Sequence, residues 1–356
     1  MGFMLSAPAY AAHSKESKEA KEAKSRTNTP LRLVALGDSI VWGQGLSVES
    51  KFVNIVTQRL PQIAGRVGKS ENYAHSGATL MNEPSDPLKV LATANGEVPR
   101  SSNSIRTQLA AVTDPKTVDI VIVNGCINDV GSNSIVLPGR SSQSAWRSIA
   151  TERCLAPMKT LLVEVLAKFP NARVVVPGYY PIFLPDDGKS SSLRLSTFGA
   201  IGNWVEDKID DLSDSLLGKA IDSACGDDTK CEKTTSSKTL RAGLASRSRW
   251  WAEESSRALR EAVDTVSRSN RTRKLAFAPV TFSSGDGVGQ AHSKLWNPGE
   301  IDPRSSDRSV ECKRAREKAP KLNFKRCVLA SSFHPNTRGA KHYADAVETA
   351  LRALLK

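Results

Sequence analysis

The chain has 356 residues, of which 39% are hydrophobic and 24% are charged, a composition typical of a globular protein with a large core. No apolar run is long enough to cross a bilayer as a helix, so we expect no transmembrane anchor. The formal net charge is +13, but the lysines and arginines are scattered and no aromatic-rich basic motif accompanies them. We therefore expect no nucleic-acid partner, while a basic surface could still contact an anionic membrane or cell-wall polymer.

The first 29 residues differ in character from the rest. Residues 9–11, Ala-Tyr-Ala, resemble the small-residue end of a secretory signal peptide. Residues 13–26 are charged and low in complexity, which indicates a solvated spacer. We expect a secreted or periplasmic protein whose folded part, residues 30–356, forms a single domain.

Six cysteines support the same location, because an even count is typical of exported proteins with disulfides. Three pairings are considered: Cys225 with Cys231, Cys312 with Cys327, and Cys126 with Cys154, unless Cys126 is simply buried. No histidine lies at metal-ligand spacing from a cysteine, so we expect no metal, and no motif implies an organic cofactor.

Short apolar runs alternate with helical periodicities along the chain. Runs typical of buried strands lie at 31–36, 118–123, 173–176 and 275–280, and helical spacing of apolar residues lies over 49–60, over 155–166 and after residue 335. This alternation predicts an α/β protein with a parallel sheet covered on both faces. Residues 186–274 break the rhythm, and we interpret them as an insertion that packs over the sheet edge or over the functional site.

Polar residues with chemical potential follow these strands. Ser39 follows 31–36, Gly77 follows a short strand-like stretch, Asn128 follows 118–123, and His334 precedes the last helix. A lone serine in such a turn is usually a helix cap. At one rim of a parallel sheet, however, a histidine could take its proton, and a glycine N–H and an asparagine amide could bind an oxyanion. The combination predicts a serine nucleophile with a base.

Four sequence blocks occur in the order found in the SGNH hydrolases, also called the GDSL esterase/lipase family: GDSIVWG, HSGAT, GCIND and SFHPN. The chain resembles this family over residues 31–350, apart from the insertion. The resemblance implies a flavodoxin-like, three-layer α/β/α sandwich. It also implies that Ser39 attacks an acyl carbonyl and that His334 shuttles the proton. The Ser39 and Gly77 N–H groups and the Asn128 side chain would form the oxyanion hole.

Two positions depart from the family pattern. Between Gly125 and Asn128 there are two residues where the family usually has one, which leaves the role of Gly125 open. The aspartate that usually lies three residues before the histidine is replaced by Ser331. The group that orients His334 could be the Ser331 hydroxyl, a backbone carbonyl such as that of Ser331, or a distant carboxylate such as Asp286. Our hypothesis is a Ser39–His334 dyad whose orienting group is not a carboxylate.

These features predict a monomeric carboxylic ester hydrolase that acts on lipid or small acyl esters, in lipid metabolism, through an acyl-enzyme intermediate. His292 and Trp296 follow the last strand, where they are candidates for the substrate wall. A carbohydrate O-acetyl esterase is the alternative among enzymes. A catalytically silent SGNH-fold binding protein is the alternative outside enzymes, and the missing aspartate favours it.

Overall fold

The computed structural model describes residues 29–81, 104–131, 135, 142–185, 231–288, 290, 292–296, 306–318, 320, 324 and 331–356. The predicted signal-like segment and the charged spacer lie outside these ranges. None of the helices described is both long enough and apolar enough to span a membrane.

The described residues form a five-stranded parallel sheet in the order β2-β1-β3-β4-β5, which is the flavodoxin-like order. The strands are β1 (Leu31–Leu36), β2 (Gly68–Asn72), β3 (Ile120–Val123), β4 (Arg173–Pro177) and β5 (Leu275–Ala278). β1, β3 and β4 read as nearly continuous apolar runs and are almost wholly buried, as expected of strands covered on both faces. The polar strand β2, GKSEN, forms one edge.

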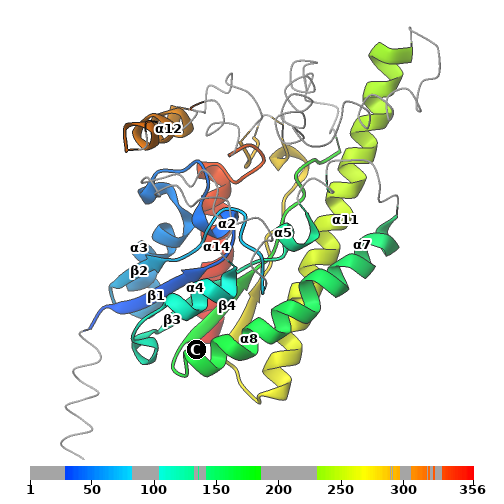
Figure 1. Cartoon of the computed structure of the whole chain (residues 1–356). Helices are drawn as coiled ribbons and strands as arrows, with labels where there is room; N and C mark the ends of the chain where they lie inside the picture. The colour runs from blue at the N-terminus through cyan, green and yellow to red at the C-terminus, as the bar shows by residue number, and fades with distance from the viewer. Residues whose placement is uncertain are drawn as a thin grey trace, which may run out of the picture.

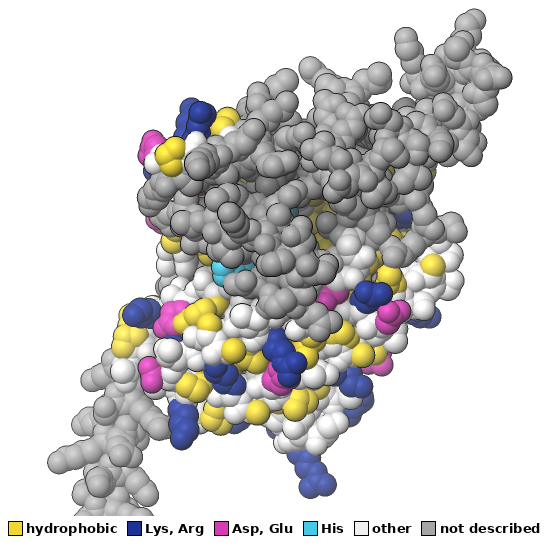
Figure 2. Space-filling model, in the orientation of Figure 1, with side chains coloured by type: hydrophobic (Ala, Val, Ile, Leu, Met, Phe, Trp, Pro, Cys, Tyr) yellow, Lys and Arg dark blue, Asp and Glu magenta, His cyan; other side chains and the backbone are white. Residues whose placement is uncertain are grey.

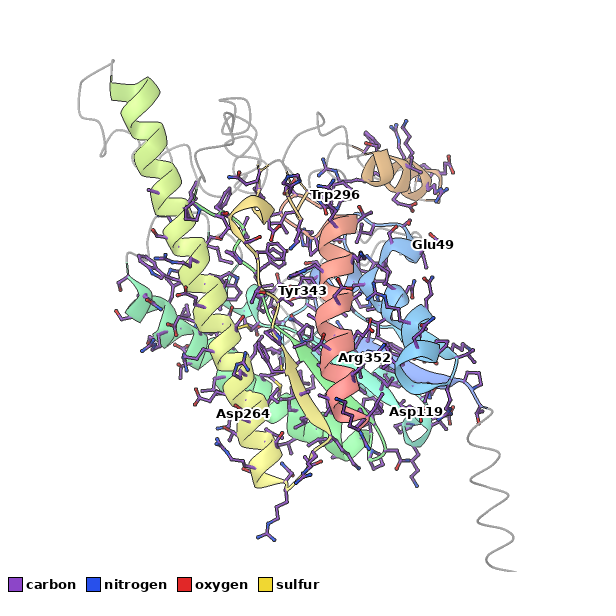
Figure 3. The ribbon with its side chains drawn as sticks, turned by 180° about the vertical axis from the view of Figure 1, so that it is seen from behind. Glu49, Asp119, Asp264, Trp296, Tyr343 and Arg352 are labelled. Atoms are coloured by element: carbon purple, nitrogen blue, oxygen red, sulfur yellow. A yellow bond between two sulfur atoms is a disulfide. The ribbon has the colours of Figure 1, made fainter. Side chains whose placement is uncertain are left out.

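Helices cover both faces of the sheet, as predicted for an α/β/α sandwich (Figures 1 and 3). On one face α3 (Phe52–Ala64) packs against β1 and β2, and α14 (Thr337–Leu354) packs against β4, β5 and α3. On the other face α4 (Ile105–Ala111) packs against β1, and α11 (Cys231–Ser269) packs against β4, β5 and α8 (Ala156–Lys168). The shorter elements are α2 (Ser39–Trp42), η1 (Val48–Ser50), η2 (Pro115–Thr117), α5 (Ile127–Val130), α7 (Gln143–Ala150), the π-helical turn η3 (Thr151–Leu155), η4 (Ser284–Asp286) and α12 (Ser306–Lys318).

Helix α11 corrects the boundary of the predicted insertion. The helix connects β4 to β5 and lies along α7 and α8 (Figure 1), so it is the crossover that two neighbouring parallel strands require. Its inner face carries residues at helical spacing: Trp251, Ser255, Ala258, Leu259 and Ala262 are all buried. The C-terminal half of 186–274 is therefore part of the sandwich. Residues 186–230 lie outside the described ranges.

A disulfide joins Cys126, which follows β3, to Cys154 in η3, with a Cα–Cα distance of 5.1 Å. Cys312, in α12, is also disulfide-bonded. Its predicted partner Cys327 lies outside the described residues, as does Cys225, the predicted partner of Cys231. The Cys126–Cys154 bond ties the loop after β3 to the layer of helices that covers it.

Candidate active site

The segments that carry the predicted site residues lie at the carboxyl ends of neighbouring strands. Residues 37–45, which we call the nucleophile turn, follow β1, and residues 124–130 follow β3. β2 lies on one side of β1 and β3 on the other, so the strand order reverses here, and open α/β sheets bind ligands at such a point. Residues 331–336, which we call the histidine turn, precede α14.

Helix α2 begins at Ser39 itself. The Asp38 side chain caps it by accepting the Ile40 N–H at 2.9 Å. The helix ends after one turn at Gly43, whose φ of 75° places it in the left-handed region that glycine adopts without strain. Gly45 follows with a φ of 82°. This sharp turn from strand to helix holds Ser39 at the rim of the sheet, where only 7% of its surface is exposed.

The first residue of the nucleophile turn, Gly37, is fixed by Gln108 of α4. Its side chain accepts the Gly37 N–H at 2.8 Å and donates to the Gly37 carbonyl at 2.9 Å. Gly37 has no room for a side chain, because an added Cβ would lie 2.5 Å from Val41 Cγ2 and 2.8 Å from the Asn124 carbonyl oxygen. Close packing and a buried amide therefore set the position of Ser39.

The structure brings Ser39 and His334 together: His334 Nε2 lies 2.7 Å from Ser39 Oγ. The other ring nitrogen, Nδ1, lies 3.1 Å from the backbone carbonyl oxygen of Ser332. A carbonyl oxygen can only accept a hydrogen bond, so this contact assigns the ring proton to Nδ1. Nε2 is then free of a proton and can accept the Ser39 hydroxyl hydrogen.

The acceptor at Nδ1 corrects the predicted Ser331. The contact is with a backbone carbonyl, one of the groups considered for this role, but it belongs to Ser332. The Ser331 carbonyl instead accepts the backbone N–H of His334, at 3.1 Å. Asp286, the other candidate, is engaged elsewhere: its Oδ2 lies 2.8 Å from Lys294 Nζ and accepts from Ser283. Burial raises the pKa of Asp286, but the hydrogen bonds from Lys294 and Ser283 lower it by more. The net result is a pKa below that of an ordinary aspartate.

Phe333 makes the Ser332 contact possible. Its φ of 67° is a left-handed conformation that a bulky residue rarely adopts. It folds the chain so that the carbonyl of Ser332 returns to the ring of His334, two residues later. The Phe333 N–H donates to the Trp296 carbonyl at 2.9 Å, and the Phe333 carbonyl accepts from the Tyr180 hydroxyl, also at 2.9 Å. Neighbouring elements therefore hold the strained residue in place.

The predicted oxyanion residues Gly77 and Asn128 lie on two loops in direct contact. Asn128 Nδ2 donates to the carbonyl of Ala78, next to Gly77, at 2.8 Å. An asparagine amide has a second N–H that this contact does not use. The neighbouring Asp129 accepts the Leu80 N–H at 3.1 Å, so the same two loops are joined twice. Gly77 has a φ of 83°, which explains why a glycine stands there.

The extra residue between Gly125 and Asn128 is accommodated by the backbone of Cys126, whose φ is 120°. Gly125 retains a packing role, because an added Cβ would lie 2.3 Å from Ile105 Cδ1 and 2.9 Å from Leu80 Cδ2. The lengthened loop thus closes against α4, with Cys126 held by its disulfide to Cys154.

Two carboxyl groups near the site have raised pKa values. Burial raises the pKa of Asp38 to about 6, although the Tyr179 hydroxyl and the Ile40 N–H lower it in part. Burial likewise raises the pKa of Asp129 to about 6, against the lowering effect of the Leu80 N–H. Neither carboxyl contacts the ring of His334 through a hydrogen bond in the described residues, and both instead brace the loops that carry Ser39 and Asn128.

Of the two predicted wall residues, Trp296 is buried and pairs with the histidine turn, while His292 is exposed. The Trp296 N–H donates to the His334 carbonyl at 2.8 Å, and Trp296 lies beside the start of α14 (Figure 3). This backbone pairing means that Trp296 supports the base. A role of either residue in binding substrate stays a prediction.

Charged side chains of both signs are interspersed with apolar ones over the described surface in Figure 2. Within the described ranges, no group of three or more histidine, cysteine, aspartate and glutamate side chains is arranged to hold a metal ion. The residues gathered at the rim of the sheet are suited to nucleophilic and acid–base chemistry.

Three residues that support the site through their side chains were not predicted from the sequence: Gln108, Tyr179 and Tyr180. All three are buried, and each reaches a catalytic segment from another element. The two tyrosines could have been noticed in the sequence PGYYP, directly after the apolar run 173–176. Tyrosine hydroxyls at the carboxyl end of a central parallel strand lie at the edge of the sheet where the site is expected.

Comparisons with known proteins agree with this geometry. The model of the GDSL-like lipase/acylhydrolase family matches residues 33–347. No curated protein sequence matches the chain significantly. Among solved structures, the extracellular lipase of Streptomyces rimosus aligns with a TM-score of 0.50 and 14% identity, covering 90% of this chain and 99% of the lipase.

Two further structures align with lower scores. Phospholipase A1 of Streptomyces albidoflavus NA297 has a TM-score of 0.47 and 13% identity, over 90% of this chain and 100% of its own. A carbohydrate esterase family 2 enzyme with a carbohydrate-binding domain, from Corynascus thermopiles, has a TM-score of 0.39 and 13% identity. The alignment covers 92% of this chain and 67% of the esterase. Because the family model spans most of the 356 residues, the chain belongs to the GDSL-like lipase/acylhydrolase family, and its fold is that of the SGNH hydrolases.

Proposed function

We propose that this hydrolase is a serine esterase that cleaves carboxylic esters, namely lipid esters or other acyl esters, through an acyl-enzyme intermediate. The observation that carries the proposal is the 2.7 Å contact between Ser39 Oγ and His334 Nε2, in a ring held at its other nitrogen by the Ser332 carbonyl. A serine hydroxyl is a weak nucleophile unless a base takes its proton, and this geometry supplies the base.

In the acylation step, Ser39 Oγ attacks the carbonyl carbon of the ester while His334 Nε2 takes its proton. The resulting oxyanion is bound by the Ser39 and Gly77 N–H groups and by the second N–H of the Asn128 amide. The bond between the carbonyl carbon and the alcohol oxygen then breaks. His334 returns the proton to the departing oxygen, and the alcohol leaves.

In the deacylation step, a water molecule gives a proton to His334 and attacks the acyl carbon. The bond to Ser39 Oγ breaks, Ser39 regains the proton, and the carboxylic acid leaves. His334 is transiently cationic in both steps. Its Nδ1–H then makes a charge-assisted hydrogen bond to the Ser332 carbonyl, which keeps the ring oriented as an aspartate does in other serine hydrolases.

A chain-length series of p-nitrophenyl esters, from acetate to palmitate, tests the proposal. Ser39→Ala and His334→Ala should each lower kcat/KM by roughly 10³-fold or more, as removal of a member of such a dyad does elsewhere. The matched controls are Ser70→Ala, whose hydroxyl bonds to Asn54 on α3, and His342→Ala, whose ring bonds to the Thr281 carbonyl. Both should stay within a few-fold of wild type.

Activity that survives Ser39→Ala would contradict the mechanism. Strong preference for the acetyl ester, together with acetate release from acetylated glycans, would redirect the proposal to a carbohydrate O-acetyl esterase. A wild-type protein that neither hydrolyses any ester nor reacts with a fluorophosphonate at Ser39 would indicate a silent binding protein.

We also propose that the enzyme works outside the reducing cytosol, at an anionic envelope surface or in the medium. The Cys126–Cys154 disulfide and the bonded state of Cys312 support this location. Fractionation of producing cells tests it, since recovery of the oxidised chain only from the cytosol would contradict it.

A further inference from the structure

Two consecutive tyrosines, Tyr179 and Tyr180, follow β4 at the rim where the site lies, and the steps of ester cleavage do not involve them. Only 1% of Tyr179 and 4% of Tyr180 is exposed. Buried tyrosine hydroxyls usually have hydrogen-bond partners. In both cases the partner belongs to a segment that carries a catalytic residue.

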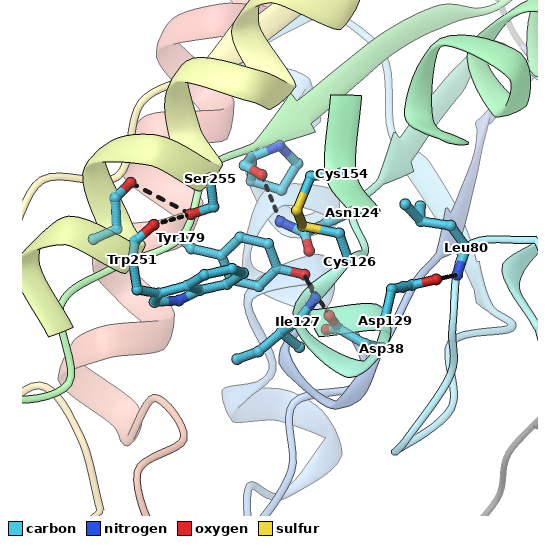
Figure 4. The surroundings of a disulfide bond; sticks show 12 residues. Asp38, Leu80, Asn124, Cys126, Ile127, Asp129, Cys154, Tyr179, Trp251 and Ser255 are labelled. Carbon is cyan, nitrogen blue, oxygen red and sulfur yellow. Dashed lines mark hydrogen bonds between the residues drawn. A yellow bond between two sulfur atoms is a disulfide. The ribbon is translucent and has the colours of Figure 1, made fainter. Parts of the chain in front are cut away.

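The Tyr179 hydroxyl joins the two loops after β1 and β3. It donates to Asp38 Oδ2 at 2.7 Å and accepts the Ile127 N–H at 3.2 Å (Figure 4). Asp38 directly precedes Ser39, and Ile127 directly precedes Asn128. One hydroxyl group therefore links the residue before Ser39 to the residue before Asn128. It donates its single hydrogen to the first and accepts a hydrogen bond from the second with one lone pair.

The Tyr180 hydroxyl reaches the third catalytic segment. It donates to the carbonyl of Phe333 at 2.9 Å, directly before His334. Phe333 is the residue with a φ of 67°, and this conformation brings the Ser332 carbonyl to the ring of His334. Because left-handed backbone is unfavourable for a bulky residue, it persists only while surrounding contacts determine it.

We propose that Tyr179 and Tyr180 are positioning residues for this site: Tyr179 sets Ser39 relative to Asn128, and Tyr180 sets His334 relative to Ser39. The inference rests on the proposed ester hydrolysis. A histidine that is oriented by a backbone carbonyl stays aligned only if the turn that carries this carbonyl is itself held in place. Tyr180 supplies that support through Phe333. Neither tyrosine touches the reacting atoms in this scheme.

The rings of both tyrosines are packed independently of their hydroxyl groups. Tyr179 lies 5.1 Å from Trp251 of α11 between ring centroids, and Tyr180 stacks on Phe282 at 5.0 Å with an interplanar angle of 11°. A phenylalanine can therefore replace each of them with the ring contacts retained. Tyr343 of α14 supplies the matched control, because its buried hydroxyl donates to the Gly178 carbonyl at 3.0 Å and, among the described residues, makes no hydrogen bond to the segments that carry Ser39, Asn128 or His334.

The test compares Tyr179→Phe, Tyr180→Phe and Tyr343→Phe in the full chain, with p-nitrophenyl butyrate as substrate. The first two variants should lower kcat by about tenfold or more at nearly unchanged KM, because a small displacement of reacting groups affects the chemical step. Tyr343→Phe should stay within twofold of wild type. Equal losses in all three variants, or no loss in the first two, would overturn the proposal.

The titration of Asp38 separates positioning from a general loss of packing. Among the described residues, the groups around Asp38 include the Tyr179 hydroxyl, the Ile40 and Val41 N–H groups, and the more distant Asp129, Tyr180 and Tyr343. The Tyr179 hydroxyl lowers the pKa of Asp38, so Tyr179→Phe should raise the pKa of that carboxyl, as followed by NMR titration of the side chain. Tyr180→Phe should leave the hydrogen bond from Tyr179 to Asp38 in place and shift this pKa less. An unchanged Asp38 pKa in Tyr179→Phe would show that Tyr179 does not act through Asp38.

Two further measurements keep the result decisive. The kcat of Asp38→Asn combined with Tyr179→Phe should be no lower than that of the more severe single variant, whereas additive losses would contradict a shared action.

The rate at which a fluorophosphonate labels Ser39 does not depend on the natural substrate. If wild type cleaves esters through Ser39 but labelling is equally fast in both tyrosine variants, the positioning role fails alone. If wild type cleaves no ester, the proposed function fails, and the labelling rates still decide the positioning role.

Discussion

The nucleophile turn and the histidine turn meet at the contact between Ser39 and His334, yet they are held by different means. In the nucleophile turn, Asp38 caps α2 from the adjacent position, and Gly43 and Gly45 adopt left-handed backbone without a side-chain penalty. In the histidine turn, the left-handed residue is Phe333, and its two backbone groups are bound by Trp296 and Tyr180 from other elements.

The two halves of the site are therefore sensitive to different kinds of change. Glycines and a neighbouring cap give the nucleophile turn a conformation that its own residues favour. The histidine turn has a conformation that its own residues disfavour, and the surrounding structure imposes it. Gln108 and Tyr179 set where the nucleophile turn lies, but its backbone conformation does not depend on them, whereas the conformation of the histidine turn should depend on residues that are distant in the chain.

Among changes that leave Ser39 and His334 intact, the largest effect is expected where the two turns touch, at Gly45. An added Cβ would lie 2.5 Å from Ser331 Cβ, and the φ of 82° disfavours any side chain. Gly45→Ala should push the turns apart and lower kcat/KM by about 100-fold or more. Steady-state kinetics with p-nitrophenyl butyrate measure this.

Gly65→Ala is the control for strain alone. Gly65 ends α3 with a φ of 68°, and an added Cβ would have no atom within 4 Å. It should lose about 1 kcal/mol of stability and keep its activity. If both variants lose activity equally, contact between the turns is not what aligns the site.

A smaller effect, on stability, should arise from Asp38 in the nucleophile turn. Burial raises its pKa from 3.8 to about 6 in the folded protein, so folding favours the protonated form. The resulting contribution to stability is complete below the unfolded pKa and is lost as the pH rises through about 6. The loss is on the order of 3 kcal/mol.

Urea unfolding of wild type and Asp38→Asn between pH 4 and pH 7 measures this contribution. The free energy of unfolding of wild type should fall more steeply with pH than that of the variant. The variant keeps the part due to Asp129, whose pKa is also raised to about 6. Parallel curves for the two proteins would show that Asp38 is not the source.

The smallest effect is expected for Ser331→Ala in the histidine turn. The contact at His334 Nδ1 is the Ser332 carbonyl, and the Ser331 carbonyl bonds to the His334 N–H, so deleting the Ser331 hydroxyl leaves both bonds. We expect kcat within threefold of wild type. Ser332→Ala, which keeps its carbonyl, should behave alike. A tenfold loss in Ser331→Ala alone would restore the Ser331 hydroxyl as the orienting group.

Most of the fold was predictable because the buried strands of a parallel sheet are continuous apolar runs. The predicted run 31–36 is β1, and 173–176 differs from β4 by one residue. The crossover helix α11 was misread as part of an insertion. Serines occupy buried positions on its inner face, among them Ser248 and Ser255, so the polar sequence concealed the face that packs on the sheet.

The candidate site was predictable in part. Ser39, Gly77, Asn128 and His334 are recognisable because each stands in one of the four sequence blocks GDSIVWG, HSGAT, GCIND and SFHPN. Ser332 was missed because its contribution comes from a carbonyl, a group that every residue has. Gln108 was missed because nothing local indicates that its side chain reaches Gly37. The place of Tyr179 after an apolar run indicates the rim of the sheet, but not the contact with Asp38.

The amino-acid sequence is sufficient to predict most strands and helices, the sharp turn at Ser39 and the set of residues able to perform acyl transfer. These features depend on the periodicity of apolar residues and on the backbone preferences of glycine and aspartate. The group that orients His334, the support of Phe333 in its left-handed conformation and the link that Tyr179 makes between the loops of Ser39 and Asn128 are visible only in the folded molecule. They depend on contacts between distant segments, such as those of Phe333 with Trp296 and Tyr180, which form only when the sheet and its two layers of helices have packed.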